Sequence, residues 1–247
     1  DTLGIEKNLV KIINKFNIKK KISFDEINTK LFSKGIIING IYFAKKKLSP
    51  QKKIKIYQGE KYIILNKNYK KKKFLDKNKN IKKVLIMSGG ADYKNFLIKI
   101  ANYLKDEKKF RTSVIIGPGV KKTNKIYKIS SSKVKKIIGL SDLSKTINNS
   151  DICICTGGTV MFEAIATGKV PIVYENYDHQ RYAIKYFNKK KAIINGGNSK
   201  NLTKESLLFL LKQYDLIDKK KYFFRNSKLI DGRGLDRTKR IISNYLR

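Results

Sequence analysis

The chain has 247 residues, of which 41% are hydrophobic, so it is long enough for one large or two small globular domains. No apolar run approaches the roughly 20 residues that span a bilayer, so the sequence predicts no membrane-spanning helix. The formal net charge of +38 at first favours a nucleic-acid-binding protein.

The type and distribution of the basic residues argue against that interpretation. Only seven of the 57 basic residues are Arg, the residue that binds bases and phosphates through two parallel hydrogen bonds. The lysines are spread from Lys7 to Lys239 and accompany many Ile and Asn, a composition that an A/T-rich genome produces. No zinc-finger, RRM or KH signature is present. We expect no nucleic-acid partner. A basic nucleic-acid-binding protein stays as an alternative, as do lysines that attract an anionic substrate or contact a membrane peripherally.

The cysteines and the single histidine do not indicate a metal site. Cys153 and Cys155 are one residue apart in a strand-like stretch, so their side chains share one face and are expected to pack in the core. A metal would need further ligands, and the only histidine, His179, is distant in sequence. We predict no metal and no cofactor, and the scarcity of cysteine favours a reducing, cytoplasmic location.

The first third of the chain mixes short apolar runs with lysine-rich segments. Residues 5–17 place apolar side chains on one face and predict an amphipathic helix. Residues 20–26 and 35–43 are strand-like, and residues 58–65 predict a short strand or a turn. The stretch 67–80 is polar, charged and without a periodic apolar face, so it is predicted to link two domains.

Strands and helices alternate regularly after this stretch. The predicted strands are residues 82–88, 111–117, 134–140, 151–156, 169–175 and 191–197. Helices are predicted after the first strand to about residue 106, and at 141–150, 160–168, 203–214 and 231–246. This alternation predicts a Rossmann-like parallel sheet with right-handed crossover connections.

Glycine and polar residues follow the predicted strands, where ligands bind in parallel sheets. The residues at these strand ends are Gly89, Gly90, Gly117, Gly139, Leu140, Ser141, Thr156, Gly157, Gly158, Thr159 and residues 175–180. The loop after the fourth strand is the most informative, because Gly157 and Gly158 let backbone N–H groups and a helix dipole approach an anion. A pyrophosphate suits such a cradle. Glycine pairs are also common in ordinary strand–helix turns.

Glu163 lies about one helical turn beyond this cradle. A carboxylate there can accept hydrogen bonds from both hydroxyl groups of a ribose, as an acidic residue does in dinucleotide-binding folds. By spacing alone, Glu163 is equally well an exposed helix residue.

The run CTGGTVMFEAIATGKVPIVYENYDHQ at 155–180 resembles the nucleotide-sugar half of GT-B enzymes, in particular MurG-type glycosyltransferases and the related PseG/SpsG family. Four more segments follow the order of the PseG/SpsG family: SFDE at 23–26, Gly59-x-x-Tyr62, SGGADYKN at 88–95 and DGRGLDR at 231–237. The resemblance therefore covers nearly the whole chain.

The resemblance implies an α/β protein of GT-B type, with an incomplete N-terminal Rossmann-like domain at 1–75 and a complete nucleotide-sugar-binding domain at 80–247. By motif match, the diphosphate would be held at Gly157, Gly158 and Thr159, the ribose at Glu163, the uracil at Gly139 and Leu140, and the sugar or diphosphate at His179 and Gln180. Without the resemblance, His179 is better interpreted as a solvated loop residue.

The implied reaction is hydrolysis of UDP-2,4-diacetamido-2,4,6-trideoxy-β-L-altropyranose in pseudaminic acid and surface polysaccharide biosynthesis. The alternative is a MurG-like glycosyltransferase with a UDP-sugar donor. In both cases we expect a UDP-sugar as substrate and a monomer.

The sequence departs from the family pattern at its N-terminal end. Residue 1 matches a point about 75 residues into a typical member, beyond the Gly-rich loop that carries the catalytic histidine. The family also tends to have Asp-x-Tyr-Gly where this chain has Asp1-Thr2-Leu3-Gly4. We therefore expect no turnover by this chain alone, and its catalytic residue stays unidentified.

Overall fold

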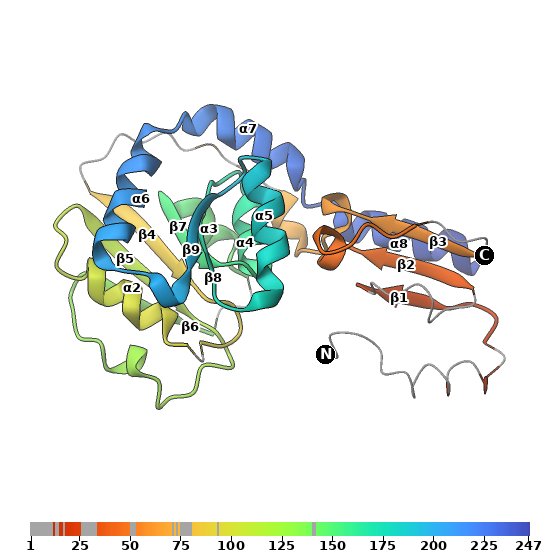
Figure 1. Ribbon diagram of the computed structural model, residues 1–247, viewed down its shortest axis with the longest axis horizontal. Coiled ribbons are helices and arrows are strands. Elements are labelled where there is room, and N and C mark those ends of the chain that lie inside the picture. Colours follow the sequence, from red (N-terminus) through yellow and green to blue (C-terminus); the bar gives the residue numbers. More distant parts are fainter. Residues whose placement is uncertain are drawn as a thin grey trace. The chain divides into compact units, whose positions relative to one another are not determined.

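A computed structural model describes residues 12, 15, 16, 18–25, 34–49, 53–70, 72, 74, 81–92, 94–139 and 142–247. The chain forms two compact units (Figure 1). Unit 1 contains residues 1–67 and 230–247, and unit 2 contains residues 68–229. Most of the predicted helix at 5–17 and of the linker beyond residue 70 lies outside the described residues.

Unit 1 contains a three-stranded parallel sheet in the order β1-β2-β3. Its elements are β1 (Ile22–Phe24), β2 (Gly35–Asn39), β3 (Ile54–Gln58), the 3-10 helices η2 (Tyr42–Ala44) and η3 (Glu60–Tyr62), and the helix α8 (Gly234–Leu246). All five residues of β2 are buried, which fits the central strand of a parallel sheet. The run at 54–58, which we had not predicted as a strand, pairs with β2 as the third strand.

The predicted strand at 35–43 is too long, because the chain turns after Asn39. The Asp25 carboxylate accepts hydrogen bonds from the backbone N–H groups of Gly40 and Ile41, at 2.9 and 2.8 Å. A side chain at position 40 would also collide with the backbone of Tyr62. These contacts direct residues 41–44 away from the sheet and into η2.

The closing motif DGRGLDR holds α8 in unit 1. Gly234 packs so closely on the Ile63 backbone that a Cβ atom would overlap it. The Arg237 guanidinium pairs with Asp231 and donates to the Lys61 carbonyl at 3.0 Å. The last helix therefore belongs to unit 1, whereas the predicted boundaries placed it in the domain at 80–247.

Unit 2 contains a six-stranded sheet in which all neighbouring strands are parallel, in the order β6-β5-β4-β7-β8-β9. Its strands are β4 (Lys82–Met87), β5 (Phe110–Ile116), β6 (Val134–Ile138), β7 (Ile152–Thr156), β8 (Ile172–Glu175) and β9 (Ile194–Asn198). All six predicted strands of this region are present. Numbered in chain order within the unit, the strands follow the order 3-2-1-4-5-6 of dinucleotide-binding folds.

The helices of unit 2 are α2 (Phe96–Leu104), α3 (Ser144–Asn149), α4 (Thr159–Ala166), α5 (Arg181–Lys189), α6 (Lys204–Leu216) and α7 (Lys219–Leu229). Helix α4 ends before Gly168, whose φ of 84° lies in the left-handed region that terminates helices. Helices α5 and α7 were not predicted. Helix α7 contains four lysines and buries only Asn226, so its apolar pattern is weak, whereas α5 buries Ala183, Ile184 and Phe187 on one face at helical spacing.

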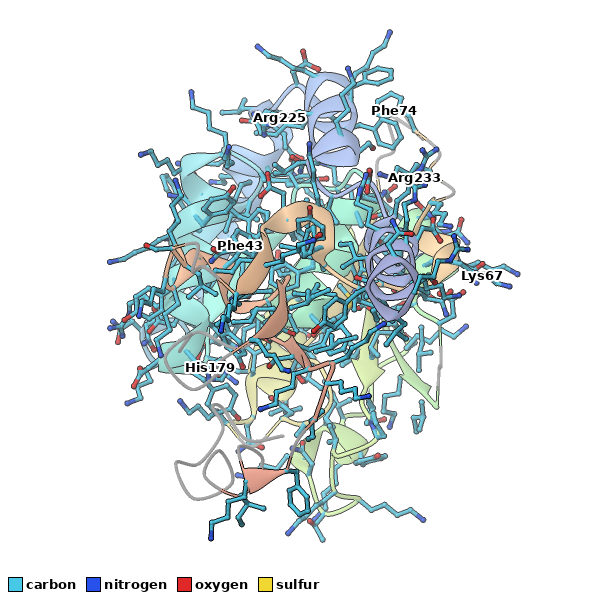
Figure 2. The ribbon with its side chains drawn as sticks, turned by 90° about the vertical axis from the view of Figure 1, so that its right-hand side faces the viewer. Phe43, Lys67, Phe74, His179, Arg225 and Arg233 are labelled. Atoms are coloured by element: carbon cyan, nitrogen blue, oxygen red, sulfur yellow. The ribbon has the colours of Figure 1, made fainter. Side chains whose placement is uncertain are left out.

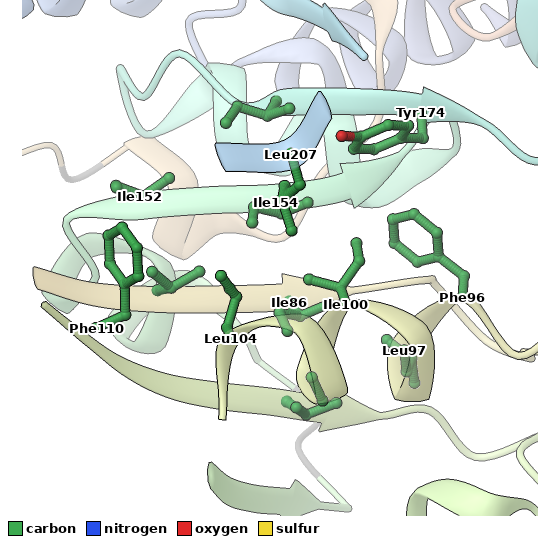
Figure 3. Close-up of a cluster of buried hydrophobic side chains, with 14 of the residues drawn as sticks. Ile86, Phe96, Leu97, Ile100, Leu104, Phe110, Ile152, Ile154, Tyr174 and Leu207 are labelled. Carbon is green, nitrogen blue, oxygen red and sulfur yellow. The ribbon is translucent and has the colours of Figure 1, made fainter. Parts of the chain in front are cut away.

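A large hydrophobic cluster lies between one face of this sheet and two helices (Figure 3). Ile86 and Ile154 come from β4 and β7, Ile100 and Leu104 from α2, and Leu207 from α6. Side chains alternate along a strand, so the neighbouring residues of β4 and β7 face the opposite side, which includes both cysteines. Cys153 and Cys155 are buried there, as predicted. Among the described residues, no helix is long and apolar enough to cross a membrane.

Candidate functional site

The site of interest lies where the chain order of the unit 2 sheet reverses. The first strand of the unit, β4, is hydrogen-bonded to β7, the fourth. Loops from such a pair diverge to opposite sides of the sheet, which opens a crevice at the carboxyl edge. Here the Thr156 hydroxyl, at the end of β7, donates to the Ser88 carbonyl after β4 at 3.1 Å. This contact joins the two loops at the edge.

The β7–α4 loop presents the start of a helix. Gly157 is buried, and a Cβ atom there would lie 2.7 Å from the Ile184 side chain and 3.0 Å from Gln180 Cβ. Gly158 occupies the N-cap of α4 and supplies no side-chain oxygen, and no hydrogen bond from a described side chain caps this helix. The first N–H groups of α4 therefore stay available, with the positive end of the helix dipole behind them.

The β4–α2 loop looks similar in sequence but differs at its helix. The carboxylate of Asp92 accepts hydrogen bonds from the backbone N–H groups of Phe96 and Leu97, at 2.8 and 3.1 Å. Asp92 is only 2% exposed, and burial raises the pKa of its carboxyl group, although the two N–H donors counteract this. The N-terminus of α2 is thus already occupied by an acidic side chain of the protein.

Gly117, after β5, packs tightly against this loop. A side chain at position 117 would overlap the carbonyl oxygens of Gly89 and Gly90. Gly119 also donates a backbone hydrogen bond to Gly90 at 2.7 Å. Gly117 is therefore a packing residue that fixes the course of Gly89 and Gly90. Nothing lies within 4 Å of the Cβ position of either Gly89 or Gly90.

Glu163 lies on α4 and is partly buried rather than fully exposed. The pKa of the Glu163 carboxyl group is raised to about 7, mainly by burial. The negative charge of Asp142 also raises this pKa, whereas the Tyr69 hydroxyl lowers it. Tyr69 is 1% exposed and belongs to the 3-10 helix η4 (Lys67–Lys70). Its hydroxyl faces Glu163 but makes no hydrogen bond of standard geometry with a described residue. The predicted linker therefore begins with a packed aromatic side chain.

The loop after β6 lies near the same carboxylate. Asp142 accepts hydrogen bonds from the Ser144 backbone N–H at 2.9 Å and from the Asn68 side-chain amide at 2.7 Å. Burial acts to raise the Asp142 pKa, but these hydrogen bonds outweigh it and the pKa is lowered. Gly139 has a φ of 74° and open space around its Cβ position. Leu140, predicted with Gly139 to contact uracil, lies outside the described residues, as does Ser141.

Two predicted residues, His179 and Gln180, lie in the 3-10 helix η6 (Asp178–Gln180) after β8. Gln180 is buried, and its Oε1 accepts hydrogen bonds from the backbone N–H groups of Asn176 and Tyr177 at 2.9 and 3.2 Å. Its amide nitrogen is 3.8 Å from the Cβ position of Gly158, so Gln180 borders the glycine cradle. His179, which is labelled in Figure 2, is exposed. Its ring stacks on that of Tyr177, with 5.8 Å between the ring centroids.

Lys94 adds a positive charge that the sequence did not single out. Its ammonium group bonds the Asn176 carbonyl and lies 4.6 Å from the centre of the Tyr177 ring. Lys94 thereby connects the loop after β4 to the loop after β8. It stands within the SGGADYKN segment, so the motif was visible but the role of its lysine was not.

All described members of the predicted site lie along the carboxyl edge of the unit 2 sheet. Thr156, Gly157, Gly158, Thr159, Glu163 and Gln180 belong to the β7–α4 loop, to α4 itself or to the loop beside them. Gly139 and His179 follow β6 and β8, at greater distance from the switch point in the strand order. Asp92 and Tyr69 were missed, because a buried cap and a long-range aromatic contact have no spacing signal in sequence.

Comparisons with known proteins place this geometry in context. No family model matches the sequence. The chain is 25% identical to the spore coat polysaccharide biosynthesis protein SpsG of Bacillus subtilis, over 99% of this chain and 75% of that protein. It is 30% identical to the uncharacterized protein MJ1062 of Methanocaldococcus jannaschii, over 71% of this chain but only 40% of that protein.

Two solved structures show the same fold. MurG of Acinetobacter baumannii superposes with a TM-score of 0.62 at 12% identity, over 95% of this chain and 76% of that chain. UGT89C1 of Arabidopsis thaliana, complexed with UDP, superposes with a TM-score of 0.63 at 14% identity, over 97% of this chain and 70% of that chain. The predicted GT-B fold class, with its Rossmann-like parallel sheets, is therefore confirmed, as is the predicted resemblance to SpsG and MurG.

Proposed function

Because the chain is a homologue of SpsG with the fold of GT-B glycosyltransferases, we propose that it binds a UDP-sugar at the carboxyl edge of unit 2 and acts in sugar transfer. A role in polysaccharide biosynthesis is supported by the name of the SpsG relative. The UDP bound by the UGT89C1 neighbour supports a uridine nucleotide as the ligand.

The single observation that carries this proposal is the uncapped start of α4 behind Gly157 and Gly158. A nucleotide diphosphate carries negative charge that free N–H groups and a helix dipole can neutralise without a side-chain cation. Glu163 lies on the same helix, one turn further along, where a carboxylate can accept two ribose hydroxyl hydrogens. Because the start of α4 and Glu163 belong to one helix, they would hold the diphosphate and the ribose at a fixed distance from each other.

In such a reaction the bond between the anomeric carbon and the diphosphate oxygen breaks, and the electron pair leaves with UDP. The N–H groups at the start of α4 would stabilise the negative charge that develops on the diphosphate. An acceptor hydroxyl forms the new bond to the anomeric carbon and gives its proton to a base. No described residue of this chain is assigned as that base.

Hydrolysis is a second candidate, with water in place of the acceptor hydroxyl. It is favoured by the family-specific segments at 23–26, 88–95 and 231–237, which resemble the PseG/SpsG hydrolase pattern. The fold comparisons favour transfer, because MurG and UGT89C1 share the fold. Transfer and hydrolysis would use the same nucleotide site. Incubation with a panel of UDP-sugars, with and without acceptor sugars, separates the two: UDP release that needs an acceptor indicates transfer.

Binding itself is tested by calorimetric titration of the chain with UDP, ADP and CMP. We expect UDP to bind more tightly than ADP and CMP, and we expect the binding of UDP to be lost in Glu163→Ala and in Gly158→Val. Binding of none of the three nucleotides would contradict the proposal. Tight binding to DNA or RNA with a steep salt dependence, together with no response to UDP, would instead support the nucleic-acid alternative.

A further inference from the structure

A basic hollow lies on the face of the unit 2 sheet opposite to α2 and α6. It has a volume of about 670 Å³ and is lined by β4, β5, β6 and α3. Each of the three strands contributes a pair of lining residues two positions apart, so that both members of a pair share this face. The pairs are Lys83 and Leu85 of β4, Arg111 and Ser113 of β5, and Lys135 and Ile137 of β6. Helix α3 has only six residues, and Lys83, Arg111 and Lys135 are exposed at the starts of their strands.

The hollow is strongly basic. Among the described residues that line it, none is Asp or Glu and five are cationic: Lys83, Lys108, Arg111, Lys133 and Lys135. None of the five forms an ion pair with any residue in the described part of the chain. Arg111 is one of only seven arginines among 57 basic residues, so the general excess of lysine does not account for it.

The strand register brings like charges together. Lys83 and Arg111 are direct partners on the neighbouring strands β4 and β5, and Lys135 is the partner of Ser113 on β6. Adjacent strands are about 4.8 Å apart, and like charges placed directly opposite one another destabilise a sheet. An anion bound between these side chains would relieve that repulsion.

The shape and the apolar part of the lining narrow the class of ligand. A volume of this size suits a small organic molecule, for which pockets of roughly 300–1,000 Å³ are usual. Ile81 and Ile137 offer apolar contact beside the cations, and the polar groups of Thr146 and Asn149 stand on α3. A single-stranded nucleic acid fits less well, because its bases stack on exposed aromatic rings, and Phe110, the only aromatic residue of the described lining, is 9% exposed.

We propose that this hollow is a second ligand site of unit 2, which binds a small phosphorylated molecule with at least two negative charges through Arg111, Lys83 and Lys135. The Arg111 fork binds two phosphate oxygens at once, and the two lysines act as compact positive charges beside it. The site is distinct from the carboxyl edge, because Lys83 and Arg111 stand at the starts of their strands. It does not depend on the nucleotide-sugar proposal.

The test is calorimetric titration with inorganic pyrophosphate in the Gly158→Val background, which obstructs the cradle at α4. We expect one pyrophosphate to bind, and we expect Arg111→Gln with Lys135→Gln to weaken that binding by about tenfold or more. The matched control replaces three exposed lysines of α6 and α7 by Gln: Lys212, Lys220 and Lys221. This control removes more charge than the double variant but should change the affinity by less than about twofold.

Equal weakening in the control and in the double variant would overturn the proposal, since it would mean unspecific attraction by the net charge. Absence of pyrophosphate binding would also overturn it. If single-stranded RNA binds more tightly than pyrophosphate, and if the double variant loses this RNA binding, the ligand of the hollow is a nucleic acid and not a small molecule. If Gly158→Val does not fold, pyrophosphate-induced shifts of the Ser113 and Lys135 amide signals in the wild-type chain supply the same test by NMR.

Discussion

The β4–α2 and β7–α4 loops of unit 2 have the same local sequence pattern but present different helix ends. Each follows a buried strand, contains two consecutive glycines and leads into a helix, and the two strands are neighbours. In the β4–α2 loop, the Asp92 carboxylate takes the N–H groups of Phe96 and Leu97. In the β7–α4 loop no described side chain does so. A glycine pair therefore indicates space for a ligand, whereas the helix cap decides whether an anion can be bound.

The largest effect is expected from Gly158→Val. The backbone at Gly158, with φ −96° and ψ −157°, is open to any residue, so the chain should still fold. The branched side chain would cover the N–H groups at the start of α4 and exclude a phosphate. We expect the Kd for UDP to rise by about 100-fold, which is about 2.7 kcal/mol. Calorimetric titration measures this change.

Gly90→Ala, in the β4–α2 loop, is the control for this variant. Nothing lies within 4 Å of its Cβ position, and its φ is not in the left-handed region. We expect a change in Kd of less than about threefold, because α2 offers no free N–H groups to a phosphate. An equal loss of affinity in both variants would show that the two loops do not differ in function.

Glu163→Gln should have the next largest effect on nucleotide affinity. Hydrogen bonds to a charged group contribute about 1.5–3 kcal/mol, so we expect the Kd for UDP to rise by at least about tenfold. The loss should be specific to the ribose, which can be measured by comparison with 2′-deoxy-UDP. If the variant loses the same affinity for the ribose and the deoxyribose nucleotide, a role of Glu163 as ribose ligand is contradicted.

The pH dependence of binding should follow the same carboxyl group. The pKa of Glu163 is about 7, and the ionised form is the one that accepts two hydroxyl hydrogens, so affinity should fall severalfold as the pH decreases from 8 to 6. A UDP-sugar is the suitable ligand, because UDP itself has a terminal phosphate that titrates near pH 6. Glu163→Gln should abolish this dependence.

Tyr69→Phe sharpens this prediction. The Tyr69 hydroxyl lowers the pKa of Glu163, so its removal should raise that pKa and shift the loss of affinity to higher pH. The variant keeps the buried ring, so stability should change little. A pH profile identical to that of the wild-type chain would show that the hydroxyl does not act on Glu163.

The smallest effect on nucleotide binding is expected from a substitution of Asp92. This substitution should affect the stability of the fold more than it affects binding. Asp92→Ala removes the side-chain acceptor at the start of α2 and should lower the free energy of unfolding by about 1 kcal/mol. Urea denaturation measures this loss. The Kd for UDP should stay within about twofold of the wild-type value, since Asp92 faces its own helix. A large loss of UDP affinity with unchanged stability would assign Asp92 to the nucleotide site instead.

The sequence by itself determined the alternation of unit 2, because short continuous apolar runs followed closely by glycine, such as those at 84–87, 114–116 and 152–155, are typical of buried parallel strands. It thereby predicted which loops share one edge, and with them Gly157, Gly158 and Glu163. The GT-B resemblance was equally visible, since it depends on the order of short motifs and not on contacts. Helix α7 was missed because lysines dilute its apolar face, whereas α5 was missed although Ala183, Ile184 and Phe187 form an apolar face at helical spacing.

Only the tertiary structure decided what surrounds these residues. The turn after Asn39 depends on Asp25, and the placement of α8 depends on Ile63, more than 160 residues away in sequence. The partial burial of Glu163 beneath Tyr69 and the alignment of Lys83 with Arg111 likewise arise from packing and strand register. Periodicity in a sequence reports which face of an element is apolar, but it carries no information on which distant side chain will meet that face.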